Sequence, residues 1–103
     1  MSNISVDLTG QVAAVTGAGN GIGKACALAL ASSGAQIALL DISASAMEQT
    51  QQEIADLGGS STAYVCDVSK VAEIKQSYAA IAQNYGNLDI AVNSAGVNVQ
   101  QRG

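Results

Sequence analysis

The feature that constrains this 103-residue chain most is a run of four glycines at alternate positions: Gly17, Gly19, Gly21 and Gly23. A short apolar run, residues 11–16, precedes them, and a segment with helical spacing follows. Glycines between a strand and a helix permit a tight turn, close approach of a phosphate to the backbone, and close helix–strand packing. The free N–H groups at the helix start then face the anion. The segment therefore predicts a phosphate-binding turn.

The rest of the chain alternates short apolar runs with helical segments. Four runs suit strands buried on both faces of a parallel sheet: residues 11–16, 36–40, 62–66 and 88–92. Three helices are expected between them, which gives the order β-α-β-α-β-α-β. Since crossovers between parallel strands are right-handed, this order predicts an α/β fold, a doubly wound parallel sheet with helices on both faces. We expect residues 1–103 to form one domain or part of one.

End signals place the three helices. The first is expected from Gly21 to about residue 33, before Gly34, and is apolar nearly all round, so we expect it to be the most buried. The second is expected to begin at Ser45, with Glu48 completing a capping box, and the third near Ser69. Two stripes should face the core: Met47, Thr50, Ile54 and Leu57 in the second helix, and Val71, Ile74, Tyr78, Ile81 and Tyr85 in the third.

Composition excludes several classes of protein. Four basic residues against eight acidic ones argue against a nucleic-acid-binding surface. Cys26 and Cys66, without any histidine, fall short of a structural zinc site, and we interpret both as reduced core residues of a cytoplasmic protein. No apolar run approaches the roughly 18 residues of a membrane span. The first seven residues lack the basic start and apolar run of a signal peptide.

The glycine spacing is more specific than glycine content. The dinucleotide pattern G-x-G-x-x-G fails, because its last glycine would fall on Ile22 or Lys24. The phosphate loop of nucleoside triphosphatases is excluded as well, since Gly23-Lys24 is followed by Ala25. The pattern that fits is T-G-x-x-x-G-x-G, with its fixed positions at Thr16, Gly17, Gly21 and Gly23.

Asp41 ends the second expected strand, where a dinucleotide would place its adenosine ribose. A carboxylate there can accept hydrogen bonds from the ribose hydroxyls and would repel a 2′-phosphate. No Lys or Arg lies nearby in sequence, and the flanking positions hold Asn20 and Ile42. We therefore expect NAD as the cofactor, with NADP disfavoured. Without the glycine turn, Asp41 would be interpreted as a solvated acid at a strand end.

Together these motifs resemble the short-chain dehydrogenase/reductase family. Residues 16–23 resemble its glycine motif, and Asp41 its NAD-selecting acid. Asp67-Val68 resembles the Asp-Val pair after its third strand, and residues 93–96 (NSAG) its N-N-A-G segment, with Ser94 in place of the second Asn. The resemblance implies the first four strands of a Rossmann-type fold, truncated before the rest. It also implies a hydride transfer between a nicotinamide cofactor and a small alcohol or carbonyl substrate, in a dimeric or tetrameric enzyme.

The resemblance also implies which residues bind the cofactor. These are Gly17, Asn20, Gly21, Ile22 and Gly23 at the pyrophosphate, Asp41 and Ile42 at the ribose and adenine, Asp67 and Val68 at the adenine edge, and Asn93, Ala95 and Gly96 beside the nicotinamide ribose. An alternative role for Asp67 is that of an acid favoured by a helix dipole.

The family's catalytic Tyr-x-x-x-Lys pair is absent from these 103 residues. Tyr64, Tyr78 and Tyr85 are followed four positions later by Val68, Ala82 and Asp89, so no catalytic residue is assigned. We expect the cofactor-binding N-terminal half of an oxidoreductase, inactive and marginally stable or self-associating by itself. One alternative is a non-catalytic NAD-binding module. Another is a different Rossmann-type protein, such as a methyltransferase or flavin protein, which the later motifs argue against.

Overall fold

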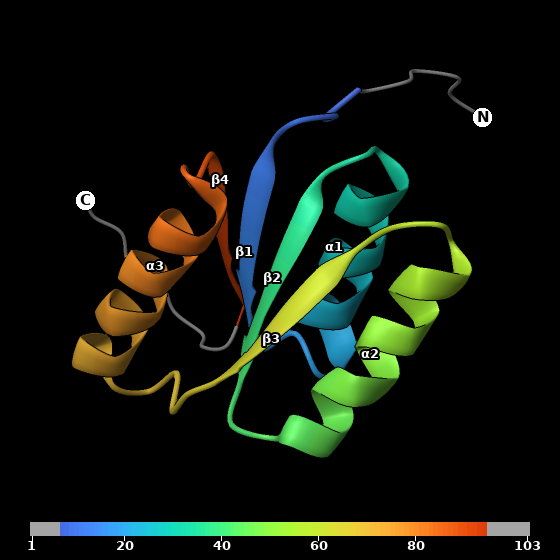
Figure 1. Ribbon diagram of the computed structural model, residues 1–103. Helices are drawn as coiled ribbons and strands as arrows, with labels where there is room; N and C mark the ends of the chain where they lie inside the picture. Colours follow the sequence, from blue (N-terminus) through green and yellow to red (C-terminus); the bar gives the residue numbers. More distant parts are fainter. Residues whose placement is uncertain (1–6, 95–103) are drawn as a thin grey trace.

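The computed structural model describes residues 7–94, which form a parallel four-stranded sheet with helices on both faces (Figure 1). The strands lie in the order β3-β2-β1-β4. Their bounds are β1 Val12–Thr16, β2 Gln36–Asp41, β3 Ser61–Val65 and β4 Ile90–Asn93. The helices are α1 Gly21–Ser32, α2 Ala44–Asp56 and α3 Val71–Tyr85. The predicted α/β topology is confirmed, with every strand end within two residues of its predicted position.

The core has two layers because α1 and α2 cover one face of the sheet and α3 covers the other (Figure 1). Alternate residues of β1 enter the two layers: Ala13 and Val15 pack with α1 and α2, whereas Val12 and Ala14 pack with Ile81 of α3. A strand buried on both faces must be apolar throughout, which explains its continuous run. The parallel pairing brings the carboxyl ends of β1, β2 and β4 to one edge of the sheet.

The start of α2 differs from its prediction. Ser43, not Ser45, is the N-cap, and its Oγ accepts a hydrogen bond from the Ala46 N–H at 3.2 Å. Ser45 lies in the first helical turn, so the predicted capping box with Glu48 is wrong. The cause is a contact from the preceding strand: Asp41 Oδ1 accepts a hydrogen bond from the Ser43 N–H at 3.0 Å, and this fixes the turn before the helix.

Helix α1 is the most buried of the three helices, as predicted, by a narrow margin: three of its 12 residues are buried, against three of 13 in α2 and one of 15 in α3. The predicted stripes are not buried over their whole length, because their ends are exposed, Leu57 to 54% and Val71 to 66%. These two residues lie at the C-cap of α2 and at the first position of α3, where each helix leaves the sheet.

The described residues give little support for metal binding. Cys26 and Cys66 are both free thiols, and residues 7–94 contain no group of three or more metal-ligating side chains. In that same range, no helix combines the length and the apolar character that crossing a membrane requires.

The outer edge of β4 leads to a prediction about the 103-residue polypeptide studied by itself. Within residues 7–94, β4 pairs with β1 and with no strand on its other side. An unpaired strand edge is a template for pairing with another chain. We expect dimers or larger species at micromolar concentration in sedimentation velocity, with a low unfolding midpoint. Cooperative unfolding of a stable monomer at that concentration would contradict this prediction.

Candidate functional site

A cavity of about 360 Å³ lies at the carboxyl edge of the sheet. Its lining residues are Gly17, Asn20, Gly21, Ile22, Gly23, Asp41, Val68 and Ser94. In open α/β sheets, ligands bind at this edge, where the strand order reverses. Here the reversal falls between β1 and β4, because the chain passes from β1 outward to β3 and returns to β4. Seven of the twelve predicted site residues are thus brought together by the fold.

Three other predicted residues, Ile42, Asp67 and Asn93, are not among the residues that line this cavity. Ile42 follows Asp41 directly and is 64% exposed, and Asp67 directly precedes Val68. Asn93 ends β4, where its Oδ1 accepts a hydrogen bond from Thr16 Oγ1 at 3.0 Å. Ala95 and Gly96 lie outside the described residues.

The glycine turn has a backbone that side chains would obstruct. Gly17 and Gly21 have positive φ values of 68° and 63°, which L-residues with a Cβ rarely adopt. Gly23 has a different constraint, since a Cβ there would collide with the carbonyl oxygen of Gly17 and with Ser94 Oγ. The start of α1 therefore lies directly against the end of β1. Positions 17, 21 and 23 of the T-G-x-x-x-G-x-G pattern each have a steric reason to be glycine.

The N-terminus of α1 is open toward the cavity. Asn20 is its N-cap residue, yet the Asn20 side chain makes no capping hydrogen bond. The first N–H groups of a helix have no acceptor within the helix, and they carry the positive end of its dipole. Earlier N–H groups of the turn are already engaged, because those of Gly17 and Ala18 donate to the carbonyl oxygen of Leu40 at 2.8 and 3.2 Å. The groups that remain for an anion are those at the helix start.

Asp41 contacts the glycine turn itself, which sequence reasoning missed. Its Oδ2 accepts a hydrogen bond from the Gly19 N–H at 2.9 Å, in addition to the bond that Oδ1 accepts from Ser43. A signal was present in Gly19, the one glycine of the run that the family pattern leaves free. A Cβ at Gly19 would lie 2.7 Å from the Ala46 Cβ and 2.9 Å from Asp41 Oδ2. The turn is thus pressed against both β2 and α2.

A buried threonine connects the end of β1, where the glycine turn begins, with the end of β4. Thr16 is fully buried, and its Oγ1 accepts a hydrogen bond from the Ser94 N–H at 3.1 Å. Ser94 Oγ in turn donates to the Thr16 carbonyl oxygen. Where the family's second asparagine would place an amide, the serine hydroxyl here makes its own bond to β1. Ser94 is therefore a lining residue of the cavity that the sequence-based assignment did not include.

Asp67 lies just ahead of α3 and is held by a local turn. Its Oδ1 accepts hydrogen bonds from the backbone N–H and the hydroxyl of Ser69, at 3.0 and 2.6 Å. These bonds stabilise the charged form, so they lower the pKa of Asp67 below its ordinary value. The carboxylate therefore stays ionised at neutral pH. Its position fits both the adenine-edge role and the alternative of an acid before a helix N-terminus.

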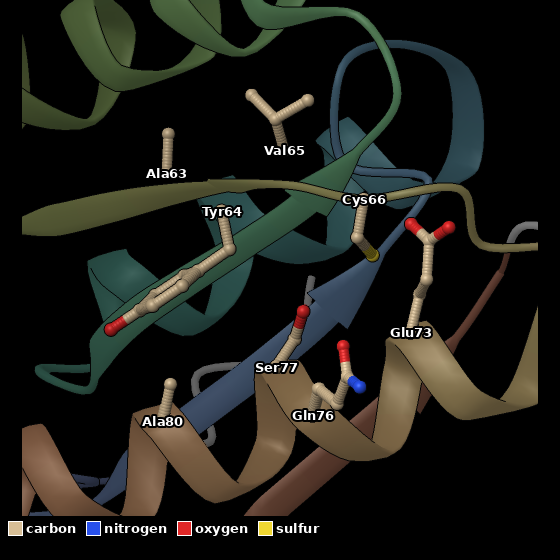
Figure 2. Close-up of a pocket in the computed structure, with 8 residues that line it drawn as sticks. All are labelled: Ala63, Tyr64, Val65, Cys66, Glu73, Gln76, Ser77 and Ala80. Atoms are coloured by element: carbon tan, nitrogen blue, oxygen red, sulfur yellow. The ribbon is translucent and has the colours of Figure 1, made fainter.

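A larger hollow of about 540 Å³ lies between β3 and α3 (Figure 2). It is lined by Ala63, Tyr64, Val65, Cys66, Glu73, Gln76, Ser77 and Ala80, none of which is a predicted site residue. It has no glycine turn, and its carboxylate is engaged, because Glu73 Oε1 accepts a hydrogen bond from the Asp67 N–H at 2.8 Å. The smaller cavity beside α1 is therefore the better candidate.

Tyr78 does not have the surroundings of a catalytic acid or base. Burial raises the pKa of Tyr78, and the nearby Cys66 thiol acts in the same direction. Catalysis by tyrosine requires the opposite shift, toward neutral pH, usually from a nearby cation. The residue four positions after Tyr78 is Ala82, not lysine.

Comparison with known proteins agrees with the resemblance that the sequence motifs indicate. Residues 11–103 match the family described as short chain dehydrogenase. D-threitol dehydrogenase of Mycolicibacterium smegmatis is 42% identical over 98 residues, which cover 91% of this chain and 38% of that protein. The chain thus spans about two fifths of that relative's length.

Two solved structures add the comparison of folds. A metagenomic short-chain oxidoreductase in complex with NADP has a TM-score of 0.82 and 38% identity, over 87% of this chain and 41% of that one. NAD+-bound xylitol dehydrogenase has a TM-score of 0.81 and 37% identity, over 87% and 35%. Structures with either cofactor therefore share this arrangement of strands and helices.

Proposed function

The chain belongs to the short-chain dehydrogenase/reductase family, and from this we propose that it binds NAD at the glycine turn. It would form the cofactor-binding N-terminal half of an oxidoreductase acting on a small alcohol or carbonyl substrate. The observation that supports this best is the cavity beside α1, which combines an uncapped helix N-terminus with the Asp41 carboxylate. One feature suits a pyrophosphate and the other a ribose.

Each part of the site would have a distinct task. The N–H groups at residues 20–23 would bind the pyrophosphate, with Gly17 allowing its close approach. Asp41 would bind the adenosine ribose, because each carboxylate oxygen accepts one backbone N–H and keeps a further lone pair for a hydroxyl. Ile42 would flank the adenine, with Asp67 and Val68 at its edge. Asn93, Ala95 and Gly96 would lie beside the nicotinamide ribose.

The preference for NAD over NADP would come from charge. A 2′-phosphate would meet Asp41, and two lysines of the described residues are engaged with acids elsewhere. Lys24 pairs with Glu53 of α2, and Lys70 Nζ lies 3.9 Å from Asp67 Oδ2. Like charges at close range disfavour binding, so Asp41 would act against NADP.

Bound NAD would supply the hydride acceptor, and the proton would need a tyrosine–lysine pair that these 103 residues do not contain. A second candidate function is an NAD-binding module without turnover. Turnover assays on the encoded protein with alcohols and ketones separate the two candidates. We also propose, from the family resemblance, a cytoplasmic protein that works as a dimer or tetramer.

Calorimetric titration of the chain with NAD, NADP and S-adenosylmethionine tests the proposal. We expect NAD to bind, NADP to bind at least about tenfold more weakly because of Asp41, and S-adenosylmethionine not to bind. Equal affinity for NAD and NADP would contradict the role given to Asp41. Binding of S-adenosylmethionine alone would contradict the proposed function as a whole.

A further inference from the structure

One peptide group of the glycine turn is held from both sides. The carbonyl oxygen of Ala18 accepts a hydrogen bond from Thr50 Oγ1 at 3.0 Å, and the N–H of Gly19 donates to Asp41 Oδ2 at 2.9 Å. Both groups belong to the same planar peptide unit, so the two bonds together fix its orientation. One partner comes from the end of β2 and the other from the middle of α2.

Thr50 has an environment that calls for an explanation. It is a polar residue with no exposed surface, next to Met47 and Ile54 on the buried side of α2. A threonine inside a helix commonly bonds the carbonyl four residues earlier, and Thr50 Oγ1 lies 3.3 Å from that oxygen, on Ala46. The shorter contact, however, is to Ala18, which lies 32 positions earlier in sequence.

The Ala18 carbonyl depends on this hydroxyl. Ala18 is fully buried, so water cannot readily replace a lost partner. Its N–H is bonded to Leu40, which leaves the carbonyl as the remaining polar group of its backbone. Removal of the Thr50 hydroxyl would therefore leave a buried acceptor unpaired and favour an open glycine turn.

We propose that Thr50 is a positioning residue for the cofactor. Together with Asp41 it fixes the Ala18–Gly19 peptide, and the adjoining N–H groups at residues 20–23 are thereby oriented before the cofactor arrives. A turn that is formed only part of the time lowers the apparent affinity by the fraction of time it is open. The inference rests on the proposed function, since it assigns Thr50 a part in NAD binding.

Residue-resolved hydrogen exchange of the full chain without any cofactor tests whether Thr50 fixes the Ala18–Gly19 peptide. Thr50→Val removes the hydroxyl at constant shape, Thr50→Ser restores it, and Thr62→Val is a matched control that removes a hydroxyl from the contact between Thr62 and Tyr85. We expect the Gly19 amide to exchange about tenfold faster in Thr50→Val and near the wild-type rate in the other two variants. The Leu39 amide in the middle of β2 serves as the internal reference for global opening.

A titration with NAD on the same proteins tests the positioning role. We expect about tenfold weaker binding by Thr50→Val alone, with recovery in Thr50→Ser. Wild-type NAD affinity in Thr50→Val would overturn the proposal, and so would equal acceleration of exchange at Gly19 and Leu39. If the wild type does not bind NAD although Gly19 exchange responds as expected, the proposed function is wrong, but Thr50 still fixes the Ala18–Gly19 peptide.

Discussion

Replacing Gly23 with alanine is expected to abolish NAD binding and to lower the free energy of unfolding by about 3 kcal/mol, toward the upper end for overpacking. The added Cβ would collide with the carbonyl oxygen of Gly17 and with Ser94 Oγ. The first of these is a backbone atom and cannot rotate away. The start of α1 must then move off the end of β1, which displaces the N–H groups proposed to bind the pyrophosphate.

Denaturant unfolding and calorimetry measure the two effects of Gly23→Ala. Gly58→Ala is the control for adding a Cβ, because Gly58 has a positive φ of 86° but a Cβ there meets nothing within 4 Å. The control should lose about 1 kcal/mol from backbone strain and keep its affinity for NAD. An NAD affinity of Gly23→Ala within a few fold of wild type would contradict the described geometry of the turn.

Asp41→Asn is expected to weaken NAD binding about a hundredfold, equivalent to about 2.7 kcal/mol. The substitution retains the shape of the side chain and removes its charge. The N–H groups of Gly19 and Ser43 donate to different oxygens of Asp41, and in an amide one of those two positions is an NH2 group, which cannot accept. The variant would therefore lose an acceptor for the ribose and one support of the glycine turn together.

The same variant separates two roles of Asp41. If Asp41 only repelled a 2′-phosphate, its neutralisation would raise NADP affinity to the level of NAD in the wild type. Because it also holds Gly19, we expect Asp41→Asn to bind NADP more weakly than the wild type binds NAD. Asp56→Asn, an exposed acid on α2 that accepts a hydrogen bond from Gln52, is the control and should bind as wild type. Unchanged NAD affinity in Asp41→Asn would contradict the proposed ribose contact and the support that Asp41 gives to Gly19.

The sheet could be predicted from sequence because its two central strands, β1 and β2, are buried on both faces. Val12, Ala14 and Val15 of β1, for example, belong to an uninterrupted apolar run, which predicts a buried strand. Strands β3 and β4 were expected to be buried in the same way but are partly exposed, because they lie at the two edges of the sheet. The start of α2 could not be predicted from sequence, since Ser43 and Ser45 are both good N-cap residues. The choice between them depends on the Asp41–Ser43 hydrogen bond, which forms only after the strand is in place.

Part of the candidate site could also be predicted from sequence. The glycine spacing indicated the turn, and the position of Asp41 at a strand end indicated the carboxylate that lines the same cavity. The contacts of Thr50 with Ala18 and of Asp41 with Gly19 join residues that are 32 and 22 positions apart. They depend on the register between the turn, β2 and α2, which no local pattern encodes.

Amide chemical shifts recorded during a titration with NAD test the central claim most directly, namely that the turn before α1 is a dinucleotide site. We predict that the largest changes occur at residues 20–23, followed by Asp41 and Val68. The larger hollow between β3 and α3, represented by Ala63 and Ser77 (Figure 2), should keep its chemical shifts. Changes concentrated in that hollow, or none at residues 20–23 at saturating NAD, would contradict the claim.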